Sequence, residues 1–226
     1  MGWAKTQREL PDNPAKGVYL PRETGGRQVV RTELEPEQTL AIAGQLQEPY
    51  ATLVLLLASV GCRGEEAVGL QPGDLDAANV LHFRRVIYGG KAEPLEKEQR
   101  IPLDAVTHAD LIRRLRAMGQ GQEWIFRTKA GTPFSVLDNG RKRYLHKAAA
   151  AICIEVGGWH DFRHTLVRKM RKAGVHPVVV SGVVGHKSVT LAAEVYDRAS
   201  AADIEQALNL VGKQLPPQLL PSGAVQ

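Results

Sequence analysis

Residues 50–60, YATLVLLLASV, are apolar on nearly every side of a helix, and this stretch most constrains the fold. A helix without a polar face has to be covered by other elements, so it belongs in a core. Gly61 follows directly and is a typical helix stop. In the preceding LEPEQTLAIAGQL, Pro36 and Glu37 occupy the first turn, as they do at many helix starts. The sequence therefore predicts two consecutive core helices.

Further helices and one hairpin are predicted beyond them. NVLHFRRVIYGG and KEQRIPL read as two strands separated by a Gly-, Pro- and Glu-rich stretch. Helices are expected at 104–118, from about Ser135 to Val156, at 161–173 closed by Gly174, at 177–184 opened by Pro177, and as two short helices N-capped by Ser188 and Ser200, the second ending at Gly212. The expected fold class is mainly α with one small antiparallel β-sheet (α+β).

Composition limits the classes of function that the chain can have. The chain has no apolar run of about 18 residues, and MGWAKTQREL lacks the features of a signal peptide, so we expect a cytoplasmic protein that is not a membrane protein. Cys62 and Cys153 have no CxxC spacing and read as small buried hydrophobes. The net charge of +5 favours an anionic partner such as nucleic acid.

The stretch GWHDFRHTLVRKM, residues 157–169, concentrates unusual chemistry at the start of a helix. His160 and Arg163 are three apart and share a helix face, so both can reach one anionic group. An arginine fork matches two phosphate oxygens, and histidine titrates near neutral pH. The alternative for an isolated HxxR pattern is a helix-capping histidine beside a solvated arginine.

Three other stretches favour the phosphate interpretation. Arg63 and Glu66 stand in an R-x-x-E-A-x-x-L context, HDFRHT follows, then a GH pair containing His186, then Tyr196. In this order and spacing they resemble the motifs of the tyrosine recombinases (phage integrases), over roughly residues 33–212. The resemblance implies that family's catalytic-domain fold.

By the same resemblance, Tyr196 is the nucleophile that attacks a DNA phosphodiester and forms a 3′-phosphotyrosine. Arg63 and Arg163 would hold the non-bridging oxygens. His160 would assist proton transfer at the tyrosine, and His186 would hydrogen-bond the phosphate. No metal or other cofactor is implied.

The family takes the proton for the leaving 5′-oxygen from a lysine on the β-hairpin after the first arginine. Lys91, which follows two glycines, is the preferred candidate, and Lys97, nearer the second strand, is the alternative. The intervening GGKAEPLEKE reads as a hairpin loop that is longer and more acidic than the family's usual turn.

Other residues receive supporting roles. Glu66 is expected to orient an arginine, Asp161 to cap the helix, and His164 to brace the site. Residues 141–147, RKRYLHK, could lie along a DNA backbone or form a solvated face.

Three other functions share part of this pattern. HDFRH has the HxxxH spacing of a zinc peptidase, but Asp161 stands where a glutamate base is required. A DNA-binding remnant or regulator without recombination activity is the main alternative. A type IB topoisomerase shares the chemistry, but the HDFRHT and GHKS contexts look more like recombinases.

The predicted organisation has three parts: residues 1–32 as a linker or remnant, 33–212 as the catalytic domain, and 213–226 as a disordered tail. The family's N-terminal core-binding domain is expected to be missing. The resemblance implies a site-specific recombinase or integrase of a mobile element, with double-stranded DNA as partner. It also implies a nucleoid location when bound and self-association as a tetramer on DNA, with residues 200–211 docking into a neighbouring subunit.

Overall fold

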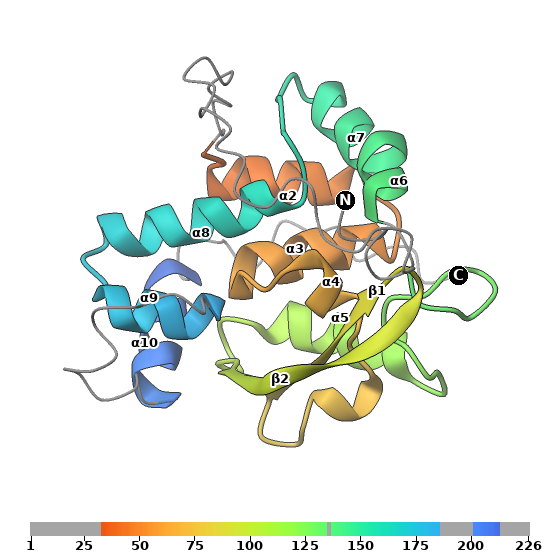
Figure 1. Ribbon diagram of the computed structural model, residues 1–226. Coiled ribbons are helices and arrows are strands. Elements are labelled where there is room, and N and C mark those ends of the chain that lie inside the picture. Colours follow the sequence, from red (N-terminus) through yellow and green to blue (C-terminus); the bar gives the residue numbers. More distant parts are fainter. Residues whose placement is uncertain (1–32, 135–136, 186–200, 213–226) are drawn as a thin grey trace, which may run out of the picture. The chain divides into compact units, whose positions relative to one another are not determined.

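The computed structural model describes residues 33–134, 137–185 and 201–212, and its elements are mainly helices (Figure 1). In chain order they are α2 (Pro36–Gly44), α3 (Tyr50–Val60), α4 (Gly64–Ala67), the 3₁₀ turn η1 (Pro72–Asp74), β1 (Val80–Tyr88), β2 (Lys91–Pro102), α5 (Ala109–Gly119), α6 (Leu137–Gly140), the π-helical turn η2 (Arg141–Leu145), α7 (His146–Ala151), α8 (His160–Lys172), α9 (Pro177–Val184) and α10 (Ala201–Gly212). The strands β1 and β2 form one antiparallel two-stranded sheet. The predicted fold class is therefore confirmed.

Helix α3 is the centre of this arrangement. Leu53, Val54 and Leu56 are fully buried, and the helix packs against α2 and α8 on one side and against α4 and α5 on another (Figure 1). The apolar sequence of α3 explains its position, because none of its faces could be left in water without cost. Around it, the other helices need only one apolar face each.

Most helix ends lie where the sequence predicts them. Pro36 opens α2, Pro177 opens α9, and Gly61 ends α3 in the left-handed conformation with φ 64°. A Cβ at residue 61 would lie 2.8 Å from Cδ2 of Leu166 on α8, so glycine is required there by space as well as by φ. α3 and α8 approach closely at this point.

Two predicted helix boundaries and one predicted burial are wrong. α5 begins at Ala109 rather than 104, because residues 104–107 form a turn in which Asp104 Oδ1 accepts the Thr107 N–H at 2.7 Å. The helical segment expected to reach Val156 ends at Ala151, and Cys153 has a positive φ of 57°. Cys153 is exposed, against prediction, whereas Cys62 is buried as predicted. The helix expected after Ser188, and Ser200 itself, lie outside the described residues.

The hairpin also differs from its prediction. The stretch read as a long loop is part of β2, and Gly89 and Gly90, both with positive φ, form the two-residue turn. Paired glycines suit this kind of turn because both positions need a left-handed backbone. The register shifts once, so that Phe83 pairs with Gln99 but Arg85 pairs with Pro94.

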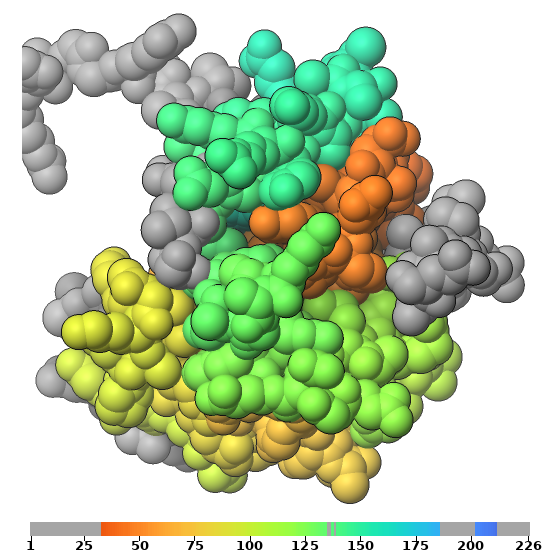
Figure 2. Space-filling model, turned by 90° about the vertical axis from the view of Figure 1, so that its right-hand side faces the viewer, coloured from red at the N-terminus to blue at the C-terminus, as the bar shows by residue number. Residues whose placement is uncertain are grey.

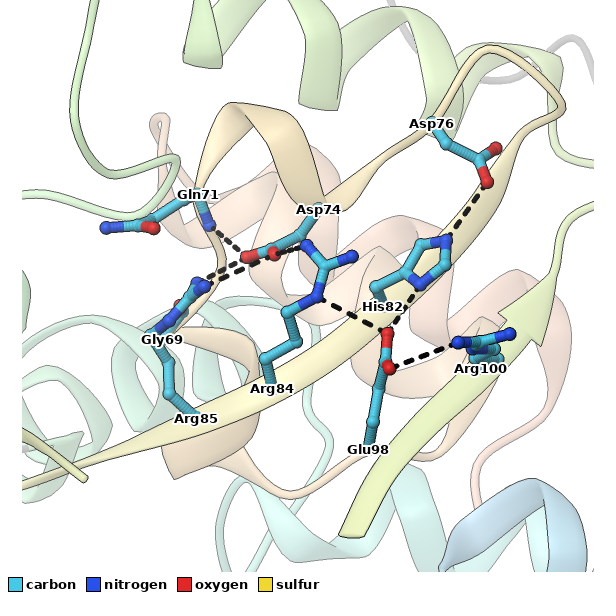
Figure 3. A network of polar contacts seen from close by, with 9 residues as sticks. All are labelled: Gly69, Gln71, Asp74, Asp76, His82, Arg84, Arg85, Glu98 and Arg100. Carbon is cyan, nitrogen blue, oxygen red and sulfur yellow. Dashed lines mark hydrogen bonds and ion pairs between the residues drawn. The ribbon is translucent and has the colours of Figure 1, made fainter. Parts of the chain in front are cut away.

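A polar network ties the base of the hairpin to the preceding loop (Figure 3). Asp74, whose side chain is buried, accepts hydrogen bonds from Arg84 Nη1 at 2.9 Å and Arg85 Nη1 at 2.5 Å. His82 Nδ1 lies 2.7 Å from Glu98 Oε1, and His82 Nε2 lies 3.0 Å from Asp76 Oδ2. Hydrogen bonding to His82 lowers the pKa of both carboxyls. The irregular part of β2 is thereby fixed at Glu98.

Two features concern the chain as a whole. Thr165 Oγ1 on α8 accepts the Leu34 N–H at 3.1 Å, which anchors the start of the described part to a helix far away in sequence. Within the described ranges, no helix is both long and apolar enough to cross a bilayer.

Candidate active site

The site is built around Arg63, which lies three residues after the last residue of α3. Its backbone caps α4, where Glu66 Oε2 accepts the Arg63 N–H at 2.7 Å and Glu66 Oε1 accepts from Arg63 Nη1 at 2.7 Å. Glu66 is almost fully buried, while the Arg63 side chain is 39% exposed. The prediction that Glu66 orients an arginine is confirmed. One edge of the Arg63 guanidinium is held by protein, and part of the group remains open to solvent.

Arg163 approaches the same place from α8. It is 5% exposed, and its Nη1 donates to the Gly61 carbonyl at 2.5 Å, a bond that joins residues 102 positions apart. Burial lowers the pKa of Arg163, and the positive charge of Arg63 lowers it further. Two guanidinium groups thus lie within electrostatic range of one another. Such a pair is costly without an anion and is relieved by one.

The turn after α9 is the third part of the site, beside Arg63 and Arg163. Gly185 ends the helix in the left-handed conformation with φ 62°, and its carbonyl accepts from Arg63 Nη2 at 3.4 Å. Segments around residues 63, 163 and 185 therefore lie close together. His186 follows Gly185 directly, but His186 and Tyr196 both lie outside the described residues.

His160 is the first residue of α8 and is exposed. It lies three positions before Arg163, so both lie on one side of the helix. The preceding Trp159 is buried, and its indole N–H donates to the Leu137 carbonyl at 3.0 Å, which fixes the start of α8. The predicted helix cap at Asp161 is wrong: Trp159 is the N-cap, and Asp161 Oδ2 instead accepts the Gly157 N–H at 2.6 Å.

The two candidate lysines occupy different parts of β2. Lys91 is the first residue after the glycine turn and pairs with Tyr88, whereas Lys97 lies in the irregular stretch opposite Arg84. Both side chains are exposed. Only Lys97 is near Gln99, the residue through which β2 contacts the turn after α9.

Gln99 had no signal in the sequence. Its amide donates to two carbonyls of α9, and no motif or periodicity of QRIPL distinguishes it from an ordinary strand residue. The Gly61 carbonyl that Arg163 contacts was missed for the same reason, since a backbone acceptor has no sequence signature.

The site has the chemistry to bind a phosphodiester. Two arginines supply planar sets of N–H donors, and a histidine at the adjacent helix start supplies an imidazole whose ring nitrogens can donate or accept a proton. No group of three or more His, Cys, Asp or Glu suited to a metal occurs among the residues that the structure describes.

The phage integrase family model matches residues 32–202, about three quarters of the chain. The chain belongs to the phage integrase family. Its sequence gave no match among curated proteins.

Solved integrases share its fold. The Tn1549 transposon integrase, in complex with transposon right end DNA, has a TM-score of 0.65 and 18% identity, covering 93% of this chain and 75% of that one. The integrase from mycobacterium phage Brujita has a TM-score of 0.60 and 17% identity, covering 98% and 69%. A lambda integrase dimer bound to a core site has a TM-score of 0.53 and 18% identity, covering 88% and 71%. Arg63, Arg163 and Gly185 meet within this family's fold.

Proposed function

We propose that this integrase is a site-specific DNA recombinase that cleaves and rejoins DNA through a 3′-phosphotyrosine at Tyr196. The observation that carries the proposal is the convergence of two arginines: Arg63 contacts the Gly185 carbonyl, directly before His186, and Arg163 contacts the Gly61 carbonyl, two positions before Arg63. Two neighbouring arginines, one of them buried, repel each other when no anion is bound. The two non-bridging oxygens of a phosphodiester can accept hydrogen bonds from both and neutralise this repulsion. Membership of the phage integrase family supports the same reaction.

In the proposed first step, the Tyr196 oxygen forms a bond to phosphorus and the bond from phosphorus to the 5′-oxygen breaks. His160 receives the tyrosine proton, and Lys91, or Lys97 in its place, donates a proton to the leaving 5′-oxygen. Arg63 and Arg163 stabilise the charge that develops on the non-bridging oxygens, and His186 hydrogen-bonds the phosphate. Rejoining reverses these transfers, so the phosphoester bond is conserved and no nucleotide is consumed.

Duplex DNA is the proposed partner. The solved relatives that contain transposon or core-site DNA support this, and the chain carries a net charge of +5. Self-association on DNA is proposed from the family resemblance. α10 packs its buried face against α9 and β2 of its own chain and leaves Leu210 exposed, which is a surface that a second copy could cover.

The test is covalent trapping on a nicked suicide substrate made from the DNA flanking the gene, in which the cleaved strand loses a short 5′ fragment. Wild-type protein should form an adduct that withstands denaturation, because the departed fragment cannot return to reseal the strand. Tyr196→Phe should bind the same DNA but form no adduct, since the phenyl ring has no nucleophilic oxygen.

Tyr88→Phe is the matched control, because Tyr88 is an exposed tyrosine outside the proposed machinery and its variant should still form adduct. A supercoiled plasmid at low salt covers the case in which the substrate lacks the target site. An adduct that persists in Tyr196→Phe would refute the nucleophile. DNA binding without any adduct in wild type would instead indicate a protein of this fold that binds DNA without recombining.

A further inference from the structure

Gln99 connects the hairpin to the end of α9. From β2, its Nε2 donates to the Val183 carbonyl at 2.5 Å and to the Gly182 carbonyl at 3.2 Å. Both carbonyls lie in the last turn of α9, where helical oxygens have no partner within their own helix. The side chain of a strand residue thus completes the hydrogen bonding of a helix more than 80 positions later.

The same side chain fills the space beside Gly185. A Cβ at residue 185 would lie only 2.6 Å from Gln99 Oε1, so the glutamine occupies the position that any other residue would need. Gly185 in turn presents its carbonyl to Arg63 Nη2. Gln99 therefore supports one side of a short turn whose other side contacts an arginine of the site.

Two acceptors define the plane of the Arg63 guanidinium. Glu66 Oε1 holds Nη1 at 2.7 Å, and the Gly185 carbonyl holds Nη2 at 3.4 Å. With the first contact alone, the planar group can rotate about its Nη1 hydrogen bond. The second contact fixes the rotation, and its position depends on the turn that Gln99 supports.

We propose that Gln99 is a positioning residue that sets the orientation of Arg63 by holding the turn after α9. The part of β2 that carries Gln99 is itself held in place, because the neighbouring Glu98 is bound to His82 in the hairpin network (Figure 3). The catalytic consequence rests on the proposed function, in which Arg63 stabilises charge on the scissile phosphate.

The first test compares Gln99→Met and Gln99→Glu with wild type in single-turnover cleavage. Methionine keeps the length of the side chain but cannot donate, and glutamate keeps the shape but turns a carboxylate toward two carbonyls. Both should cleave the ordinary phosphodiester about 10- to 100-fold more slowly, the range expected when a reacting group is misplaced. Gln122→Met, at an exposed glutamine after α5, is the control and should cleave at the wild-type rate.

The decisive comparison uses a substrate in which a methyl group replaces one non-bridging oxygen of the scissile phosphate. This linkage is neutral, so its cleavage depends less on an oriented arginine. The defect of Gln99→Met should therefore shrink on the methylphosphonate. An equal defect on both substrates, with unchanged thermal unfolding, would overturn the proposal, because a general loss of fold or of proton transfer affects both alike.

A measurement of DNA affinity tests whether Gln99 acts through Arg63 without requiring any cleavage. In a double-mutant cycle, Gln99→Met and Arg63→Met are measured singly and together for affinity to the same duplex. If Gln99 acts through Arg63, the second substitution should cost little once the first is present. Additive losses would overturn the proposal. A wild-type protein that binds DNA but forms no adduct would refute the proposed function alone, and this cycle would still judge Gln99.

Discussion

His108 is a buried histidine at the start of α5, and neither of its ring nitrogens has a hydrogen-bond partner among the residues that the structure describes. Burial lowers the pKa of His108, with Asp104 acting in the opposite direction. A neutral ring can be accommodated in such a place, whereas a protonated ring would have to give up its hydration. The core around α5 therefore depends on His108 remaining neutral.

We expect His108→Leu to reduce the loss of stability in acid. The folded pKa lies below the unfolded value of about 6.5, so the unfolded chain binds the proton more readily. The stability that comes from keeping His108 neutral should be fully present above pH 6.5. It should be lost as the pH decreases from there through the folded pKa of His108. Urea unfolding between pH 7.5 and 5 measures this, and the fall should be smaller in the variant. Parallel pH profiles for the two proteins would contradict the assignment.

The hairpin is the element whose form was least accessible from the sequence. Pro94 and three glutamates in residues 91–98 resemble a loop, yet this stretch belongs to β2, and residues 91–94 pair with β1 across a two-residue glycine turn. Edge strands tolerate proline and charge because one side of each strand faces solvent. The loop propensity of these single residues is overridden by pairing with β1 and by the polar network around His82 and Glu98.

This geometry allows the two lysines to be separated by experiment. Lys91→Ala and Lys97→Ala should differ in single-turnover cleavage, and only the lysine that protonates the 5′-oxygen should cost about 100-fold or more. A sulfur at the bridging 5′ position leaves without a proton, so it should restore the rate of that variant alone. We expect Lys91 to be the rescued position. Rescue at Lys97 would move the role to the residue nearer Gln99, and rescue at neither would remove the hairpin from acid catalysis.

Other elements were predictable because their ends carry chemical signals. Helix boundaries are marked directly by Pro36, Gly61, Gly174 and Pro177. The prediction of α8 required only the HDFRH motif and the glycine that follows the helix. The convergence of Arg63 and Arg163 was implied by the resemblance to the tyrosine recombinases. The contacts that orient them could not, because Gly61 and Gly185 act through backbone carbonyls and Gln99 acts through tertiary position.

At the scale of the whole molecule, positive charge is concentrated on one exposed segment. Lys142, Arg143, His146 and Lys147 are exposed along η2 and α7, beside the half-exposed Tyr144. Lys142, Arg143 and Lys147 form no ion pair with any residue in the described ranges. In Figure 2 this segment, green to teal, lies at the surface on a face that also shows part of the hairpin in yellow. Cations without acidic partners suit a phosphate backbone.

Replacing Lys142 and Arg143 together by glutamine should weaken binding to all duplexes alike. Each lost phosphate contact removes about 0.9 from the slope of log affinity against log salt concentration, so the slope should become shallower by roughly 2. Arg113→Gln with Lys172→Gln is the matched control, since both are exposed cations that already pair with Asp110 and Glu33. Equal slopes for the two double variants would indicate that residues 142–143 form only a solvated face.

The bond from Arg163 to the Gly61 carbonyl affects how relatives of this chain should be compared. A buried guanidinium that joins α8 to the end of α3 would be retained by selection for folding, even in a descendant that no longer cuts DNA. An arginine at this position in a related genome is therefore poor evidence of activity. Arg63 pairs with the buried carboxylate of Glu66, so the same reasoning applies to it, and neither arginine by itself marks an active enzyme.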